Sequence, residues 1–174
     1  MKKFSKEVHA IENKGLMHNF SEYKWLMSVA MDEAYKAYSI DEVPIGAAIV
    51  DESGNILSQC HNEKEHCNDP CGHAEIIAIR EACKKRGDWR LSGCTIYVTL
   101  EPCPMCLSAM IQARVDKLVF AAYDPKGGAI SLNYNLYKDK RLNHNFSVVG
   151  GIGHFESSKV LSRFFREKRS SYKK

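Results

Sequence analysis

The sequence predicts an α/β fold in which a mixed sheet is covered by helices on both faces. Two patterns support this prediction: a β-hairpin signal in the first third of the chain, and strands that alternate with helices after it. The chain has 174 residues, of which 44% are hydrophobic, which is enough for one substantial core but little for two domains. We therefore expect one globular domain.

The hairpin follows a predicted first helix. Apolar residues recur at helical spacing from Ser21, a suitable N-cap, to about Tyr38. The period then changes, because IGAAIV (45–50) and ILSQCH (56–61) flank DESGN, whose Ser-Gly-Asn core signals a turn. These two segments are expected to pair as a β-hairpin.

The rest of the chain alternates between helical and extended patterns. A helix is expected over 73–87, because its apolar pattern ends at Gly87 and glycine commonly ends helices. Further along we expect a strand at 94–100, a short helix at 103–113, strands at 117–123 and 147–152, and a helix at 156–169. Residues 1–19 are polar and are expected to form a loosely held extension that can be disordered, followed by a single domain over 20–174.

Composition indicates a reducing compartment. No stretch approaches the roughly eighteen apolar residues of a membrane span, and no apolar segment follows Lys2 and Lys3 at the N-terminus. An odd number of cysteines fits such a compartment better than a disulfide framework. The seven cysteines are at positions 60, 67, 71, 83, 94, 103 and 106. We therefore expect a cytoplasmic protein without a membrane partner.

The positive charge is concentrated at the C-terminus. Residues 159–174 carry a net charge of +6, whereas the whole chain carries +4. A basic end on a near-neutral body is compatible with a polyanion partner, although the charge alone favours a solvated face of a terminal helix. The charge alone therefore does not establish nucleic-acid binding.

Two short motifs suggest a metal site, and each lies where a strand or loop is expected to lead into a helix. They are His73-Ala74-Glu75 and Pro102-Cys103-Pro104-Met105-Cys106. Cysteines at i and i+3 of a first helical turn face the same way, and the helix dipole favours the thiolate form that binds metals. Pro104 fits such a turn, where a missing N–H costs nothing.

The ligand set can be completed in two ways. A closed structural zinc site needs four protein ligands, which Cys67 and Cys71 with His66 could help to supply. An open site would use His73, Cys103 and Cys106 and leave the fourth position to water, as a catalytic zinc requires. No metal role is assigned to the other histidines, at positions 9, 18, 61, 66, 144 and 154.

Glu75 favours the open site. It stands two residues after His73, where it can approach the metal without binding it and can carry protons. An acid in the first turn of a helix is also favourable for the helix dipole, and that explanation would suffice if Glu75 stood alone. Beside His73 and the paired cysteines, the proton-carrying role is the better interpretation.

These motifs resemble the signature of the zinc-dependent cytidine deaminase superfamily. Within it, residues 21–169 are similar to the bacterial tRNA-specific adenosine deaminases. The matching stretches are EVPIGA (42–47), Asn62, Asp69-Pro70, HAEIIAIR (73–80), YVTLEPCPMC (97–106), VFAAYDPKGGA (119–129) and RFFREKR (163–169). The chain departs from the family at Cys71-Gly72, where Thr-Ala is usual.

The resemblance implies a three-layer α/β/α cytidine-deaminase-like fold around a five-stranded mixed sheet, a homodimer, and one zinc ion per subunit. It implies that His73, Cys103 and Cys106 bind the zinc and that Glu75 is the proton shuttle. The residues implied to bind the substrate are Asn62, Ala74, Asp124 and Lys126. The basic C-terminal residues expected to contact RNA are Arg163, Arg166, Lys168 and Arg169.

The activity implied by the resemblance is hydrolytic deamination of adenosine to inosine at the wobble position of tRNA, with the anticodon stem-loop as partner. Two alternatives remain at this point. A deaminase of a free base or nucleotide, such as guanine or cytosine, would use the same zinc and glutamate. A non-catalytic RNA-binding module stabilised by zinc would not bind a transition-state analogue of adenosine deamination.

Overall fold

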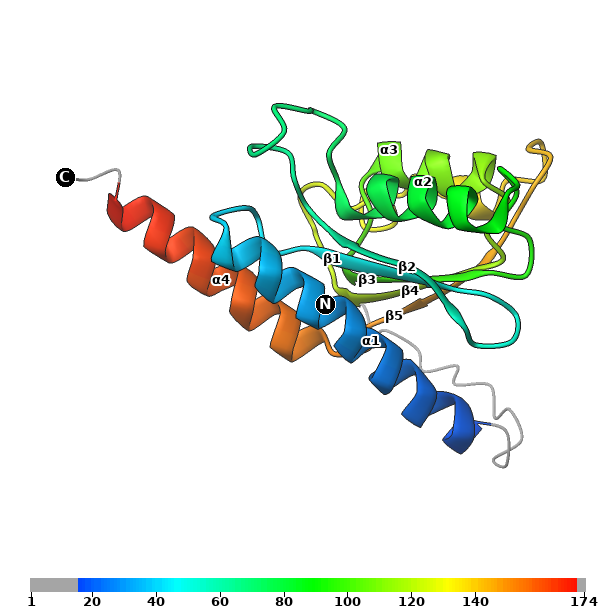
Figure 1. Cartoon of the computed structure of the whole chain (residues 1–174), viewed down its shortest axis with the longest axis horizontal. Coiled ribbons are helices and arrows are strands. Elements are labelled where there is room, and N and C mark those ends of the chain that lie inside the picture. Colours follow the sequence, from blue (N-terminus) through cyan, green and yellow to red (C-terminus); the bar gives the residue numbers. More distant parts are fainter. Residues whose placement is uncertain (1–15, 172–174) are drawn as a thin grey trace, which may run out of the picture.

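The computed structural model describes residues 16–171, so residues 1–15 and 172–174 lie outside the described part of the chain. The elements in chain order are α1 (Leu16–Ser39), β1 (Gly46–Val50), β2 (Ile56–His61), α2 (Ala74–Arg86), β3 (Thr95–Leu100), α3 (Pro104–Gln112), β4 (Lys117–Ala122), the 3₁₀ helix η1 (Leu136–Lys138), β5 (Ser147–Gly150) and α4 (His154–Ser171) (Figure 1).

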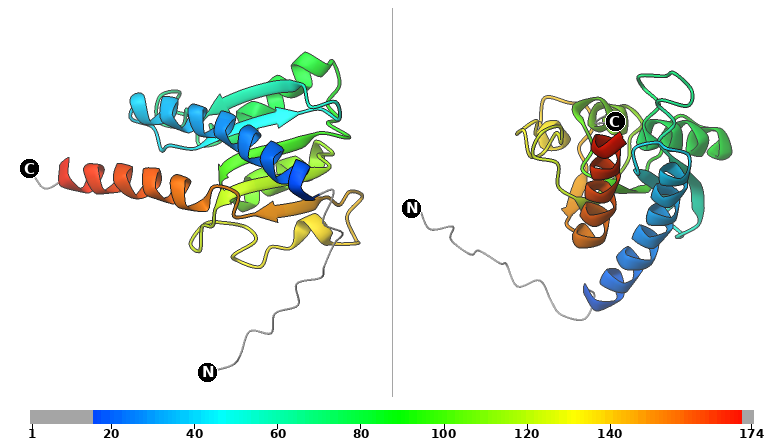
Figure 2. Two further views of the ribbon diagram at one scale, coloured as in Figure 1. Left: turned by 90° about the horizontal axis from the view of Figure 1, so that it is seen from below. Right: turned by 90° about the vertical axis from the view of Figure 1, so that its left-hand side faces the viewer.

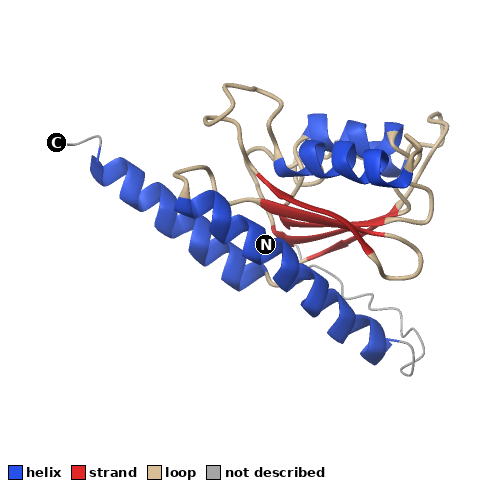
Figure 3. Cartoon of the chain, viewed as in Figure 1, coloured by secondary structure: helices blue, strands red, loops and turns tan. Residues whose placement is uncertain are grey.

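The five strands form one mixed sheet in the order β2-β1-β3-β4-β5. Strand β1 is antiparallel to both β2 and β3, whereas β3, β4 and β5 are parallel to one another. Helices α2 and α3 cover one face of the sheet, and α1 and α4 lie on the other (Figure 3). The predicted α/β/α architecture and the predicted hairpin are therefore confirmed.

Each face of the sheet has its own apolar core. Small residues of α2, including Ala74, Ala78 and Ala82, are fully buried against the strands, which lets the helix approach closely. On the other face, α1 buries Leu26 and Ala30. Gly46 in β1 permits that contact, because a Cβ atom there would lie 2.0 Å from the carbonyl oxygen of Ala30.

Helices α1 and α4 meet where both approach their C-terminal ends (Figure 2). The rings of Tyr38 and Phe164 pack edge to face, with their centroids 5.7 Å apart. Tyr38 also donates a hydrogen bond to Glu167, and Lys168 pairs with Asp41 at 2.5 Å. These contacts fix the direction in which α4 extends past the sheet.

The predicted start of the first helix was wrong. Helix α1 begins at Leu16, so Ser21 is an exposed residue inside the helix rather than its N-cap, and the expected boundary at residue 20 falls within α1. Serine costs only about 0.5 kcal/mol in a helix interior, so a cap-like serine need not end the helical pattern. Of the extension expected over residues 1–19, residues 16–19 belong to α1, and residues 1–15 lie outside the described part of the chain.

Two further expectations concern thiols and membranes. All seven cysteines lie in the described part of the chain, and each has a free thiol. This agrees with the expectation that they do not form a disulfide framework. Among the described helices, none combines the length and apolar character needed to cross a bilayer.

Candidate metal centre

The candidate ligands lie at the starts of two helices. His73 is the N-cap residue of α2, with extended backbone angles of φ −80° and ψ 143°. Cys103 is the N-cap residue of α3, Pro104 begins that helix, and Cys106 follows in its first turn. Because α2 and α3 lie on the same face of the sheet, their N-terminal turns bring the three side chains together.

The three side chains form a compact cluster whose ligand atoms all lie within 4.8 Å of one another. The Nδ1 atom of His73 is 3.7 Å from Sγ of Cys103 and 3.5 Å from Sγ of Cys106. Zinc with ordinary bond lengths in a tetrahedral site would hold such nitrogen and sulfur atoms about 3.6 Å apart. The donor set and its spacing therefore fit zinc with one position left open.

The closed alternative is not supported by the described residues. Cys67 and Cys71 do not belong to the cluster, and the Cys67 thiol instead donates to the Glu63 carboxylate at 3.5 Å. His66, the third residue of that alternative, is likewise outside the cluster. Within the described residues, the candidate site therefore has three ligands, His73, Cys103 and Cys106.

The electrostatics of the cluster favour metal binding. The Cys106 thiol and the His73 ring, through hydrogen bonds, lower the pKa of Cys103 to about 4, although burial opposes this. The hydrogen bond to Cys103 raises the pKa of Cys106, and burial and nearby Glu75 raise it further. Without metal, the pair therefore holds one thiolate and one thiol, and a dication could replace the remaining proton.

Glu75 lies beside the ligands but outside the ligand cluster. It is the second residue of α2 and only 4% exposed. Burial raises the pKa of its carboxyl to about 7, while the nearby His73 opposes that shift. A carboxyl that gains and loses a proton near neutral pH is suited to general acid–base catalysis.

Two of the expected substrate-binding residues contact each other. The side-chain Oδ1 of Asn62 accepts a hydrogen bond from the backbone N–H of Ala74 at 3.0 Å. Both residues are buried, and the bond satisfies one of the free N–H groups at the start of α2. Asn62 therefore helps to place the helix that carries His73 and Glu75, and its contact with a substrate stays a prediction.

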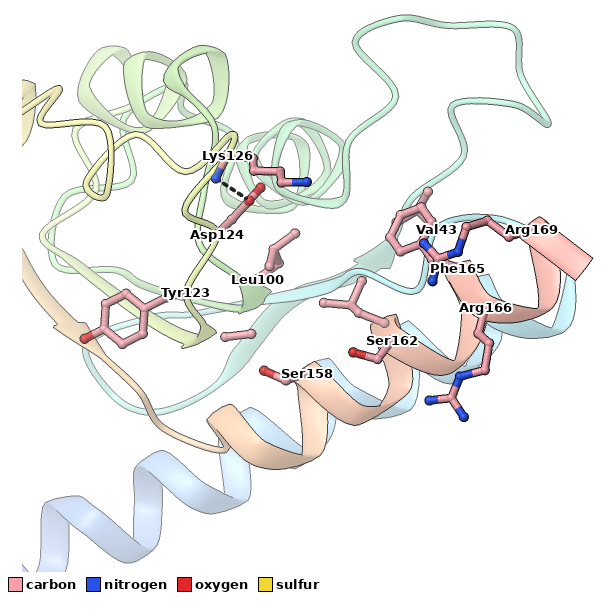
Figure 4. Close-up of a pocket in the computed structure, with 12 residues that line it drawn as sticks. Val43, Leu100, Tyr123, Asp124, Lys126, Ser158, Ser162, Phe165, Arg166 and Arg169 are labelled. Carbon is pink, nitrogen blue, oxygen red and sulfur yellow. Dashed lines mark hydrogen bonds between the residues drawn. The ribbon is translucent and has the colours of Figure 1, made fainter.

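The other two expected substrate-binding residues, Asp124 and Lys126, lie in the loop after β4. They line a pocket of about 670 Å³ together with Phe165, Arg166 and Arg169 of α4 (Figure 4). The Oδ1 atom of Asp124 accepts the backbone N–H of Lys126 at 3.0 Å. The metal ligands and Glu75 are not among the residues that line this pocket. The pocket is therefore separate from the candidate metal cluster, and the contact of Asp124 and Lys126 with a substrate stays a prediction.

The four basic residues expected to contact RNA divide into two pairs. Arg166 and Arg169 line the pocket to which Lys126 also contributes. Arg163 instead pairs with Glu167, with its Nε atom 2.9 Å from Oε1, and Lys168 pairs with Asp41. Arg163 and Glu167 are four residues apart on one helix, so the sequence could have suggested that pair. The Lys168–Asp41 pair and the lining of the pocket depend on where α4 lies, which the sequence does not show.

The comparisons with known proteins agree with this geometry. The family model for the cytidine and deoxycytidylate deaminase zinc-binding region matches residues 20–122, more than half of the chain. This chain belongs to that deaminase family. The match spans every candidate ligand and Glu75.

Individual members of the deaminase family are also similar. The tRNA-specific adenosine deaminase of Bacillus subtilis is 48% identical over 84% of this chain and 91% of its own. A structure solved in a study of A-to-I editing by tRNA:A34 deaminases at the wobble position is 40% identical. It covers 79% of this chain and 99% of its own, with a TM-score of 0.75. A guanine deaminase structure from Bacillus subtilis is 30% identical and covers 71% of this chain and 82% of its own, with a TM-score of 0.57.

Glu101, which opens the motif EPCPMC, is a residue whose role the sequence did not predict. In the structure it is 3% exposed and accepts hydrogen bonds from Asp124 and Ser131. An acidic residue directly after the apolar strand TIYVTL was a signal that could have marked it, because unpaired carboxylates are rarely buried.

Proposed function

We propose that this chain is a zinc-dependent deaminase that converts the wobble adenosine of tRNA to inosine and ammonia. The observation that supports this most directly is the open cluster of His73, Cys103 and Cys106, with Glu75 buried beside it. The 48% and 40% identity to tRNA adenosine deaminases supports the choice of substrate.

His73, Cys103 and Cys106 would hold the zinc ion. When bound, zinc lowers the pKa of a water ligand to about 7 and so supplies a nucleophile near neutral pH. The protein contributes two thiolates and one imidazole, which fix the ion at the starts of α2 and α3. Glu75 is left unliganded and can move protons.

Glu75 carries the proton transfers in the proposed reaction. It takes the proton released from the attacking water and delivers it to N1 of adenine, while the new C–O bond forms at C6. It then passes a proton to the leaving amine as the C–N bond breaks. Water and adenosine are thus converted to inosine and ammonia without a further reactant.

Asn62 would help to seat the base, and the pocket beside α4 would hold the RNA backbone. A base must leave the stack before its C6 atom can react, and an anticodon loop offers unpaired bases at small cost. No ion pair of Arg166 or Arg169 is found within residues 16–171, and both line the same pocket as Lys126. We assign the phosphate contacts to these three side chains, since acidic partners engage Arg163 and Lys168.

A free-base activity is the second candidate. The similarity to a guanine deaminase structure favours it, because the same metal ligands and glutamate could act on a free purine. The basic pocket has no evident use for a small neutral base, and this favours the tRNA substrate.

One assay separates the two candidates. Zinc-loaded protein is incubated with an arginine tRNA anticodon stem-loop that carries a wobble adenosine, and in parallel with guanine and with cytosine. We expect inosine from the stem-loop and no xanthine or uracil. The matched control is Glu75→Gln protein prepared in the same way, which excludes a contaminating deaminase. Xanthine or uracil without inosine would establish the free-base activity instead.

We also propose that the protein acts as a homodimer in the cytoplasm, as the resemblance implies. Large apolar side chains exposed on the monomer support a partner surface: Leu132 and Tyr134, 43% and 50% exposed, lie in the segment after the Asp124 loop. Sedimentation equilibrium of the zinc-loaded protein should give twice the mass of the chain. A monomer mass at micromolar concentration would contradict the proposal.

A further inference from the structure

The carboxylate of Glu101 is buried between the end of β3 and the loop after β4. Its Oε2 atom accepts hydrogen bonds from the backbone N–H of Asp124 at 2.9 Å and from the Ser131 hydroxyl at 2.5 Å. Its Oε1 atom accepts the backbone N–H of Ser131 at 2.6 Å. One side chain therefore holds both ends of the segment 124–131.

The backbone on either side of Glu101 is joined to the same loop. The N–H of Glu101 donates to the carbonyl of Ala122 at 2.8 Å, and the N–H of Ala129 donates to the carbonyl of Pro102 at 2.8 Å. The loop packs directly on the carboxylate, because a Cβ atom at Gly128 would lie 2.3 Å from the carboxyl carbon of Glu101. Residues 101–102 and 122–131 thus form one connected unit next to Cys103.

This loop places Asp124 and Lys126 in the lining of the pocket to which Arg166 and Arg169 also contribute (Figure 4). We propose that Glu101 is a positioning residue: its buried carboxylate holds loop 124–131 so that Asp124 and Lys126 are presented to the substrate. This inference rests on the proposed function, since it concerns the same substrate. It assigns Glu101 no contact with the reacting atoms.

Glutamine is the sharpest substitution at this position. A carboxylate can accept all three hydrogen bonds, whereas an amide turns one acceptor into a donor that faces an N–H or O–H donor. Glu101→Gln keeps the size of the side chain but releases at least one end of the loop. Glu33→Gln is the matched control, because the Glu33 carboxylate is also buried but bonds to Lys36 and His61.

The first measurement is amide hydrogen exchange of the zinc-loaded variants. We expect exchange across residues 124–131 to rise about tenfold or more in Glu101→Gln, because a buried hydrogen bond to a charged group has been lost. Exchange there should be unchanged in Glu33→Gln, and the zinc content of both variants should equal that of the wild type. Unchanged exchange, or loss of zinc, in Glu101→Gln would overturn the inference.

The second measurement is kinetic. With the stem-loop substrate, Glu101→Gln should raise KM about tenfold and change kcat less than about twofold, because the loop positions RNA rather than transferring protons. In a protein that already carries Asp124→Ala and Lys126→Ala, adding Glu101→Gln should raise KM by less than about twofold. Full additivity would show that Glu101 acts independently of the loop.

The two measurements separate this inference from the proposed function. Hydrogen exchange needs no substrate, so it reports on the loop whatever the enzyme acts on. A wild-type protein that makes no inosine overturns the proposed function. Normal exchange in the Glu101→Gln loop overturns the positioning role.

Discussion

The Nδ1 atom of His73 lies 3.5 Å from the Sγ atom of Cys106, although 33 positions separate the two residues in the sequence. The contact joins the first turns of α2 and α3, which pack on the same face of the sheet. The ligand atoms are held by helix starts rather than by a flexible loop. A metal ion would therefore bind to a site whose shape the fold already sets.

Zinc should protect the two cysteines of this site from alkylation. Cys103 is half-buried and Cys106 fully buried, so a chelator that strips the metal should leave the Cys103 thiol open to iodoacetamide. Mass spectrometry of peptides should show modified Cys103 in the stripped protein and little in the zinc-loaded protein. Exposed Cys67 is the internal control, because it should react equally in both. Equal labelling of Cys103 with and without zinc would contradict its role as a ligand.

Replacing Glu75 should stop turnover without removing the metal. Glu75→Gln removes the proton-carrying carboxyl but keeps its size, and Glu75 is not part of the ligand cluster. We expect kcat to fall about 100-fold or more, the usual contribution of a general acid–base group. Zinc content and stem-loop affinity should stay close to those of the wild type. Substantial remaining activity would show that another group transfers the protons.

Local signals explain why much of the fold could be predicted from the sequence. Gly87 ends α2 in the left-handed region at φ 73°, which glycine adopts easily, and the turn signal at 51–55 marks the hairpin. The motifs that place His73 and Cys103 at helix starts are equally local. The start of α1 was missed because Ser21 matches a cap pattern that the longer helix overrides.

Contacts between distant segments explain what the sequence could not show. Lys168 pairs with Asp41, 127 positions away, while Arg166 lines the pocket, and α4 alone does not show either fact. Likewise, the role of Glu101 depends on partners 23 and 30 positions away. Such roles follow from the packing of α4 and of the loop after β4.

The two pairs of basic residues on α4 should differ in RNA binding. Arg166→Ala and Arg169→Ala should each weaken stem-loop affinity about fivefold, equivalent to ~1 kcal/mol. Each should also reduce the slope of the logarithm of the binding constant against the logarithm of the salt concentration by about 0.7 per lost phosphate contact. Arg163→Ala is the matched control, because Arg163 pairs with Glu167 and lies away from the pocket. Fluorescence anisotropy over a range of salt concentrations measures both quantities. Equal effects of all three substitutions would mean that the helix acts only through its net charge.

The glycines of the loop after β4 should differ in how well they tolerate a methyl group. A Cβ atom at Gly128 would lie 2.3 Å from the carboxyl carbon of Glu101 and 2.5 Å from Oε1. That carboxylate is held by three hydrogen bonds, so it cannot move aside without losing some of them. Gly128→Ala should therefore displace the loop and destabilise the protein by about 1–3 kcal/mol.

Gly127→Ala is the matched comparison, since its Cβ atom would meet only the side chain of Asp124, with Oδ2 at 2.9 Å and Cγ at 3.7 Å. Because the end of that side chain can rotate, we expect the free energy of unfolding to fall by less than about 1 kcal/mol. Urea unfolding of the zinc-loaded variants measures both values. The double variant Gly128→Ala/Glu101→Gln should lose less free energy of unfolding than the two single variants lose together, because both changes disturb the same contact. Equal losses at Gly127 and Gly128, or additive losses in the double variant, would show that the carboxylate of Glu101 does not hold the loop in place.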